Sequence, residues 1–255
     1  FGVDNEPTSD GDDGSIGDRN SPTVLNAAFH QTQFWDGRAK DVEEQAGMPI
    51  LNPVEMAIPS EEFLVDRLKA TEDYPPMFAA AFPDETDSLT YLNIQKALGA
   101  FERTLITPSR FDAYLEGDKD ALSEQEMAGM EKFIQLGCTT CHNGVNVGAY
   151  SFQKFGLFGD YWEHTGSKKV DEGRYAVTEE DADKFVFRVA SLRNVAETAP
   201  YFHDGSVETL EEAIRVMVAV QLAIELRDEE VDNLAAFLRS LSGEVPLEAL
   251  QSAGN

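Results

Sequence analysis

Cysteine, basic side chains and long apolar runs are all scarce in this sequence. The 255 residues include only two cysteines, so no second cysteine pair exists to complete a zinc site. Twenty basic residues against 47 acidic ones give a net charge of -27. Nucleic acid and anionic membranes are therefore poor partners, because phosphate contacts need lysine and arginine. No run of about 18 or more apolar residues occurs, so the sequence predicts no membrane-spanning helix.

The start of the chain also lacks familiar signals. FGVDNEPTSD contains neither an initiator methionine nor a basic leader region, and we expect a processed or truncated chain. Hydrophobic residues make up 42% of the sequence, which is typical of a globular protein. The length allows one large domain or two smaller ones.

Helical periodicity dominates what is present. Apolar residues recur at three- and four-residue spacing in 60–70, 89–105, 123–137 and 228–243, and these segments predict helices. Another helix is expected to begin at Thr209, where Glu212 completes the spacing of a capping box. Ser123 and Glu126 show the same capping-box spacing.

The remaining segments contain breakers and polar residues. Residues 4–20 are rich in glycine, aspartate and serine and predict a loop, and 108–122 predicts a connection. Residues 143–207 predict irregular structure with one short strand near 185–189. Pro108 favours a domain boundary at Thr107–Pro108.

Both cysteines lie in the short sequence QLGCTTCHNGV, where His142 follows Cys141 directly. A thioredoxin-like redox pair at Cys138 and Cys141 would normally lie next to a βαβ unit, and the sequence predicts no such unit here. A zinc site needs four ligands, and the only downstream histidines, His164 and His203, are far apart. Cys-x-x-Cys-His is also typical of c-type haem attachment. That interpretation uses all three residues and implies an oxidising, extracytoplasmic compartment.

A second axial ligand to such a haem is the next question. An electron-transfer haem favours methionine, whose thioether raises the reduction potential. Met127 and Met130 are too close in sequence to the motif to reach the far face of a haem easily. Met217 lies downstream on an apolar helix face, where core packing is the competing interpretation. The residues alone leave the ligand open.

Several long motifs resemble one known family. The sequences NSPTVLNAAFHQTQFWDGRAKDVEEQAGMPILNPVEMA, GCTTCHNG, FRVASLRNVAETAPYFHDGSVETLEEAI and FLRSLSGE together resemble the bacterial di-haem cytochrome c peroxidases over nearly the whole chain. The resemblance implies a mostly α fold with two cytochrome-c-like helical domains. Residues 1–107 would be the remainder of the peroxidatic domain, incomplete at its N-terminus, and 108–255 the C-terminal electron-transfer domain. The terminal helix is expected to cross the helix that precedes Cys138.

The resemblance implies roles for the residues around the haems. Cys138, Cys141 and His142 resemble the motif of the C-terminal, electron-accepting haem. Met217 resembles its distal methionine. Trp35 resembles the tryptophan between the two haems, although a core aromatic is the simpler interpretation of the residue alone.

Further resemblances concern the peroxide and calcium sites. Gln45 and Glu55 resemble polar residues over the peroxidatic haem, where a carboxylate can act as general acid and base and the amide can orient peroxide. Asn20, with the backbone carbonyls of Thr198 and Pro200, resembles an interdomain calcium site, and oxygen ligands suit that cation. Without the resemblance, Glu55 is a loop carboxylate and Asn20 a turn former.

Two departures from the family pattern stand out. The N-terminal haem needs its own Cys-x-x-Cys-His, which this sequence lacks, and we expect that motif just before Phe1. Asp12 stands where resting enzymes carry a histidine that blocks the peroxidatic iron, and residues 1–29 contain no histidine. An open iron is also found in related di-haem oxidases of protein side chains. The best-known of these has tyrosine in place of Met217, which favours a peroxidase here.

The sequence therefore supports a main function and two alternatives. The main prediction is a periplasmic enzyme that reduces hydrogen peroxide with electrons from a small cytochrome c or a cupredoxin. Two haem c groups, one attached to this chain, and calcium are its predicted cofactors. The acidic surface favours a basic donor, and the family predicts a homodimer. The alternatives are a c-type cytochrome that only transfers electrons and a di-haem oxidase of an organic or protein substrate.

Overall fold

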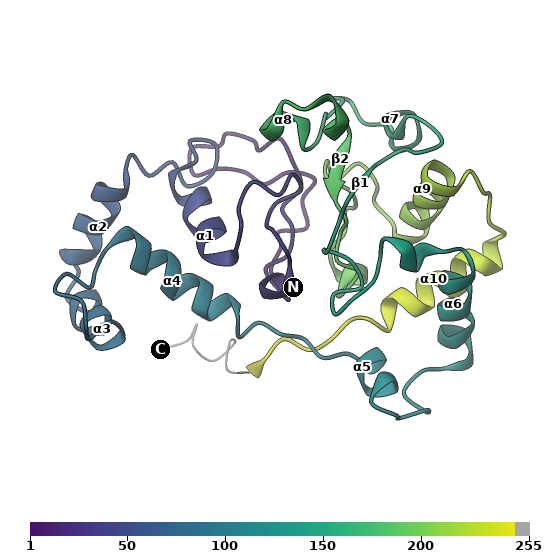
Figure 1. Cartoon of the computed structure of the whole chain (residues 1–255), viewed down its shortest axis with the longest axis horizontal. Coiled ribbons are helices and arrows are strands. Elements are labelled where there is room, and N and C mark those ends of the chain that lie inside the picture. The colour runs from purple at the N-terminus through teal and green to yellow at the C-terminus, as the bar shows by residue number, and fades with distance from the viewer. Residues whose placement is uncertain (248–255) are drawn as a thin grey trace.

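Helices form most of the regular secondary structure in the computed structural model, which describes residues 1–247 (Figure 1). The α-helices in these residues are α1 (Val42–Leu51), α2 (Glu61–Lys69), α3 (Tyr74–Ala81), α4 (Tyr91–Glu102), α5 (Arg110–Leu115), α6 (Glu124–Gln135), α7 (Tyr161–Thr165), α8 (Tyr175–Thr178), α9 (Leu210–Leu222) and α10 (Asp228–Arg239). The 3-10 turns are η1 (Ala27–Phe29), η2 (Cys138–Thr140), η3 (Asp181–Asp183) and η4 (Val195–Glu197). The predicted mostly α fold is confirmed.

Side-chain caps fix where several helices begin. Ser60, Thr90 and Ser123 each accept a hydrogen bond from a backbone N–H in the first turn of α2, α4 and α6. The capping box predicted at Ser123 forms completely, with the Glu126 carboxylate bonded to the Ser123 N–H. At α9 the Thr209 hydroxyl accepts from the Glu212 N–H at 3.3 Å, which is one half of the predicted box. These bonds satisfy N–H groups that a helix start otherwise leaves without partners.

Two predicted irregular segments contain more regular structure than expected. The connection predicted at 108–122 contains α5, which begins with a reciprocal pair of bonds between Ser109 and Asp112. The strand expected near 185–189 is confirmed as β2 (Val186–Arg188), paired antiparallel with β1 (Phe152–Lys154). Helices α7 and α8 also lie within the segment predicted to be irregular.

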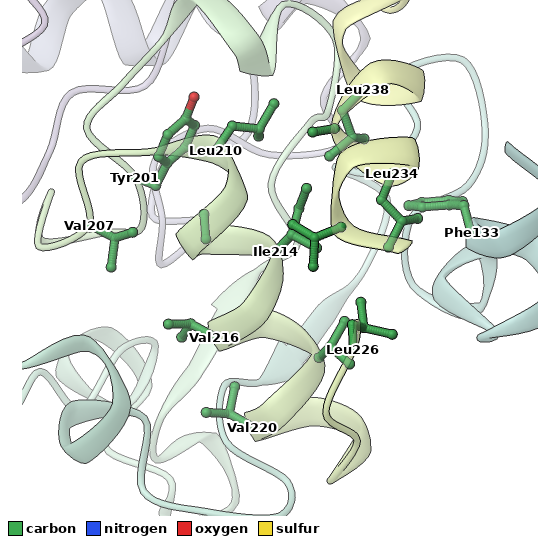
Figure 2. Close-up of a cluster of buried hydrophobic side chains, with 14 of the residues drawn as sticks. Phe133, Tyr201, Val207, Leu210, Ile214, Val216, Val220, Leu226, Leu234 and Leu238 are labelled. Atoms are coloured by element: carbon green, nitrogen blue, oxygen red, sulfur yellow. The ribbon is translucent and has the colours of Figure 1, made fainter. Parts of the chain in front are cut away.

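Helices α6 and α10 cross at Gly129, as expected for the terminal helix and the helix before the cysteine motif (Figure 1). A methyl group on Gly129 would lie 1.9 Å from the Asn233 carbonyl oxygen. Only glycine therefore allows this close approach. Phe133 of α6 and Leu234 and Leu238 of α10 belong to the large buried cluster that continues onto α9 (Figure 2).

A smaller core joins three helices in the first half of the chain. Phe78, Leu89 and Ile94 form this core among α2, α3 and α4, away from α6, α9 and α10 (Figure 1). Thr107 at the predicted domain boundary is fully buried and accepts hydrogen bonds from Asn26 and Asn194, at 2.8 and 2.9 Å. The division at Thr107–Pro108 stays a prediction. No helix in residues 1–247 combines the length and apolar character needed to cross a bilayer.

Candidate functional site

The cysteine motif forms a tight turn at the end of α6. Gly137 has a φ of 79°, and this left-handed residue redirects the chain into η2. The backbone N–H groups of Cys141 and His142 both donate to the Cys138 carbonyl, at 3.2 and 2.9 Å. Both cysteines are free thiols, and burial raises the pKa of each. The turn therefore presents two thiols and one imidazole from five consecutive residues.

All three motif side chains line one cavity of about 480 Å³, which we name the C-terminal cavity. Its volume is within the range of about 300–1,000 Å³ common for small-molecule and cofactor sites. Apolar side chains of three helices dominate its wall, and several of them are drawn in Figure 2. These include Phe133 of α6, Leu210 and Ile214 of α9, and Leu234 and Leu238 of α10. An apolar cavity with two thiols at its edge fits a covalently attached porphyrin.

His142 is prepared to act as a metal ligand. Burial lowers the pKa of its imidazole to about 4, so the ring is neutral at physiological pH, the form that binds metals. Gly148 packs closely beside the His142 ring. A methyl group on Gly148 would lie 2.0 Å from the Ala190 carbonyl oxygen and 3.3 Å from His142 Nδ1. The backbone of Gly148 therefore lies directly against the His142 ring.

Met217 lies on α9 and lines the same cavity as the motif. It is partly buried and packs against the large hydrophobic cluster. Among the six methionines of the sequence, all within residues 1–247, Met217 is the one that lines this cavity. Packing and ligation are thus compatible, and the axial role of Met217 stays a prediction.

The alternative interpretations of the motif find little support in the described residues. In residues 1–247 no three or more histidine, cysteine, aspartate or glutamate side chains gather where they could hold a metal ion. A zinc site at Cys138 and Cys141 therefore lacks its remaining ligands. The sheet formed within these residues is a two-stranded antiparallel one, not the βαβ unit expected around a thioredoxin-like pair.

A second, larger cavity of about 1470 Å³ brings Trp35, Gln45 and Glu55 together, and we name it the N-terminal cavity. Gln45 comes from α1, and Glu55 follows the end of that helix. The Glu55 Oε2 atom is buried without a hydrogen-bond partner in the described residues. Asp12 also lines this cavity, and its backbone N–H donates to the Glu55 carbonyl at 2.7 Å. The loop carrying Asp12 is thereby attached to the backbone of Glu55.

The two cavities share a wall. Trp35, His30, Arg188 and His203 line both of them. Trp35 Nε1 donates to the Asn20 carbonyl at 2.8 Å, and its ring meets His203 edge-on with centroids 6.3 Å apart. The predicted place of Trp35 between two cofactor sites is consistent with this geometry.

Sequence reasoning did not single out Arg188, His30 or His203 as site residues. Burial lowers the pKa of Arg188 to about 10 and that of His30 to about 3, with the Arg188 charge contributing to the shift at His30. Two of the four histidines in the sequence thus lie on the shared wall. The rarity of histidine was the one signal that could have drawn attention to them.

The predicted calcium ligands lie near the same wall. Asn20, Thr198 and Pro200 all line the C-terminal cavity. The Asn20 amide nitrogen donates to the Glu6 carbonyl at 3.0 Å, so its amide oxygen is the atom available to a cation. Oxygen ligands of this kind suit calcium, and the site stays a prediction based on one amide and two carbonyl oxygens.

Comparison with known proteins agrees with this arrangement. A model of the di-haem cytochrome c peroxidase family matches residues 1–120. The cytochrome c551 peroxidase of Pseudomonas aeruginosa is 46% identical over 246 residues, which cover 96% of this chain and 70% of that protein. The cytochrome c551 peroxidase of Nitrosomonas europaea is 44% identical, with 96% and 72% covered.

A solved structure shows the same fold. The crystal structure of a MauG-like protein associated with microbial copper homeostasis superposes with a TM-score of 0.81 at 29% identity, and the match covers 94% of this chain and 80% of that one. Sequence, cavities and fold thus agree, and the chain belongs to the di-haem cytochrome c peroxidase family.

Proposed function

We propose that this enzyme reduces hydrogen peroxide to water, with electrons that enter from a small cytochrome c or a cupredoxin at a haem in the C-terminal cavity. The observation that carries the proposal is the wall shared by the two cavities. One cavity holds the haem-attachment motif, the other holds Glu55 and Gln45, and Trp35 lies between them. Electrons received at one cavity would therefore pass Trp35 to reach peroxide in the other.

In the C-terminal cavity, Cys138 and Cys141 would hold haem c through thioether bonds. His142 and Met217, which line the same cavity, would ligate its iron. The bound iron would supply one-electron transfer, and the thioether of Met217 would keep its potential high. Apolar side chains line the cavity around these ligands.

Donor docking is expected where the C-terminal cavity reaches the surface. Leu157 lines the cavity and is still 58% exposed, so an apolar side chain stands at its rim. The net charge of -27 would attract a basic donor over a long range. A basic cytochrome or cupredoxin with an apolar contact face would meet both conditions.

In the N-terminal cavity, Glu55 would act as the general acid and base. Its unpartnered Oε2 atom could take a proton from the near oxygen of peroxide and return it to the leaving oxygen. Gln45 would orient the peroxide through its amide. A second haem, expected from the family's N-terminal domain, would supply the redox chemistry for the reduction of peroxide beside these side chains. Asp12, beside Glu55, cannot block the iron of that haem as an imidazole would, so we expect turnover without prior reductive activation.

The remaining parts of the proposal concern the compartment, the calcium ion and the oligomeric state of the enzyme. Haem c is attached in oxidising compartments outside the cytoplasm, so we place the protein in the periplasm. Asn20 and the carbonyls of Thr198 and Pro200 would bind calcium between the two halves of the chain. The family further predicts a homodimer.

Intact mass and steady-state turnover together test the function. The denatured protein should retain covalently attached haem, and the complete enzyme should oxidise a reduced cytochrome c when peroxide is added. Glu55→Gln should lower the turnover number roughly 100-fold or more, because a positioned acid–base group typically contributes about 10²–10⁴. Glu62→Gln, an exposed residue of α2, is the matched control and should leave turnover unchanged.

The same experiment separates the alternatives. A fully haem-loaded enzyme that transfers electrons without peroxide turnover would favour an electron-transfer cytochrome. Peroxide consumption that depends on an organic or protein substrate, and not on a cytochrome donor, would favour an oxidase. Either result would overturn the peroxidase proposal.

A further inference from the structure

The wall between the two cavities contains buried polar groups with nothing to bind in the described residues. Arg188 is 4% exposed and His203 is 2% exposed. The Nη1 atom of Arg188, the Nε2 atom of His203 and both ring nitrogens of His30 are buried without hydrogen-bond partners. All three side chains line both cavities. Buried polar groups are nearly always paired in proteins, so this group indicates a missing ligand.

Arg188 is held rigidly in this position. It is the last residue of β2, and its backbone N–H donates to the Trp35 carbonyl at 2.7 Å. Its Nε atom donates to the Phe34 carbonyl at 3.0 Å. The first bond holds the backbone of Arg188, the second restrains its guanidinium, and Nη1 is left without a partner in a side chain that lines both cavities. Burial lowers the pKa of Arg188 only to about 10, so the group carries its positive charge at neutral pH.

The chain supplies no carboxylate directly to this charge in residues 1–247. The charge of Asp36 acts on Arg188, but the Asp36 carboxylate is bonded to other arginines. Its Oδ2 atom accepts from Arg19 at 2.6 Å and from Arg38 at 2.9 Å, and its Oδ1 atom also accepts from Arg38. A buried charge without a close partner is strongly unfavourable, so an anion from outside the chain is expected.

His30 indicates the kind of anion. Its ring is neutral, because burial and the nearby Arg188 charge lower its pKa to about 3, so one ring nitrogen donates an N–H. A flat guanidinium beside an N–H donor matches a carboxylate, which accepts through two oxygens in one plane. A hard cation is excluded at this position by the Arg188 charge.

We propose that Arg188 and His30 bind a propionate carboxylate of the haem held in the C-terminal cavity. The proposal rests on haem attachment at Cys138 and Cys141, as proposed above. Thioether bonds attach haem c by its vinyl groups, and the propionates project from another edge of the porphyrin. The C-terminal cavity extends from Cys138 to Arg188, so a porphyrin attached at one end would bring its carboxylates towards the wall.

This contact would do more than anchor the cofactor. Arg188 bonds to the backbone of both Phe34 and Trp35, so it would join a haem carboxylate to the residue between the two cavities. His30 follows η1 in the same N-terminal segment. The carboxylate would thereby help to set the position of Trp35 relative to the C-terminal haem.

The test uses the haem-loaded enzyme and two spectroscopic readouts other than activity. Arg188→Met should lower the midpoint potential of the methionine-ligated haem, because a buried positive charge near it is lost, and should shift its propionate bands in resonance Raman spectra. Arg188→Lys should preserve most of the potential but still shift the bands, since lysine lacks the planar fork. His30→Leu should shift the bands with little change in potential.

The matched control for Arg188→Met replaces an arginine on the surface. Arg103 pairs with Glu43 on the surface at 2.8 Å, and Arg103→Met should change neither the potential nor the Raman bands. If Arg188→Met does not fold, Arg188→Lys and His30→Leu still provide the Raman test.

Three outcomes would overturn the inference. Wild-type bands and potential in the folded Arg188 and His30 variants would show that these residues do not contact a propionate. Shifts confined to the bands of a second haem would assign the carboxylate to the other cavity. A wild-type protein without thioether-linked haem would remove the attachment on which the proposal rests, and the absent haem spectrum would distinguish that failure from the first two.

Discussion

Gly129 of α6 lies directly against the backbone of α10, so Gly129→Ala tests the crossing that supports the C-terminal cavity. The added methyl would lie 1.9 Å from the Asn233 carbonyl oxygen and 2.8 Å from the Phe237 Cβ atom. Ordinary contacts of a Cβ atom begin near 3.4 Å, so α10 would have to move by about 1.5 Å. The obstructing atom belongs to a helix backbone, which cannot rotate away as a side chain can.

Overpacking and helix propensity act in opposite directions on the free energy of unfolding of Gly129→Ala. Overpacking of a buried contact costs about 1–3 kcal/mol, and a clash with helix backbone belongs at the upper end. Alanine favours a helix over glycine by about 1 kcal/mol, which offsets part of this cost. We therefore expect Gly129→Ala to lower the free energy of unfolding by about 2 kcal/mol. For a chain of this length that corresponds to a fall in melting temperature of about 4–8 °C.

Thermal unfolding followed by circular dichroism measures this change. Ala128→Ser alters the exposed neighbour on the same helix and should change stability by less than about 0.5 kcal/mol. Phe133, Leu234 and Leu238 come from these helices and line the cavity, so the absorption spectrum of the bound haem should change with Gly129→Ala as well. A variant that melts at or above the wild-type temperature would refute tight packing of α6 on α10 at Gly129.

Three further predictions address the ligand set, an ion pair and the donor. Met217→His should lower the midpoint potential of the C-terminal haem in a redox titration, because imidazole replaces a thioether, and an unchanged potential would contradict ligation by Met217. Arg193 binds Asp112 through two hydrogen bonds of 2.7 and 2.6 Å, and the pKa of Asp112 is lowered from 3.8 to about 2. Because the unfolded state holds this proton more tightly, the interactions of the Asp112 carboxylate with Arg193 and Ser109 together contribute about 2 kcal/mol above about pH 4, and this contribution is lost as pH falls towards 2. Urea unfolding should show a weaker acid dependence for Asp112→Asn, and an identical dependence would argue against the pair. Reduction by a basic cytochrome should slow as ionic strength rises from about 0.01 to 0.15 M, since the screening length falls from about 30 to 8 Å, and a constant rate would argue against electrostatic docking.

Local residues mark where a correctly predicted helix begins. Helix α6 combines an apolar stripe with a complete capping box at Ser123, so local residues determine it. Helix α5 was missed because its box uses Asp112 at the position where glutamate or glutamine is typical. Helix α1 was also missed, and Pro49 inside it is the kind of residue that normally argues against a helix. Packing against α4 supports α1 despite this proline.

Some residues of the candidate site could be predicted from the sequence, and others only from the fold. Cys138, Cys141 and His142 lie within one turn, so their spacing alone predicts that they act together. Met217 is 75 residues beyond His142, and only the fold brings it to the same cavity. Arg188 could not be recognised from sequence, because its significance depends on burial without a partner, which arises from tertiary contacts.

The relation between the two cavities depends on how one short segment is docked. Arg19 donates to Asp171 at 2.6 and 2.9 Å, and the two residues are 152 positions apart in sequence. The neighbouring Asn20 N–H donates to the His203 carbonyl, and the Asn20 carbonyl accepts from Trp35. Trp35 is thus held by contacts to the second half of the chain as much as by its own segment. Because buried, charge-assisted bonds tolerate little misplacement, the position of Trp35 is a property of the docked halves and not of either half alone.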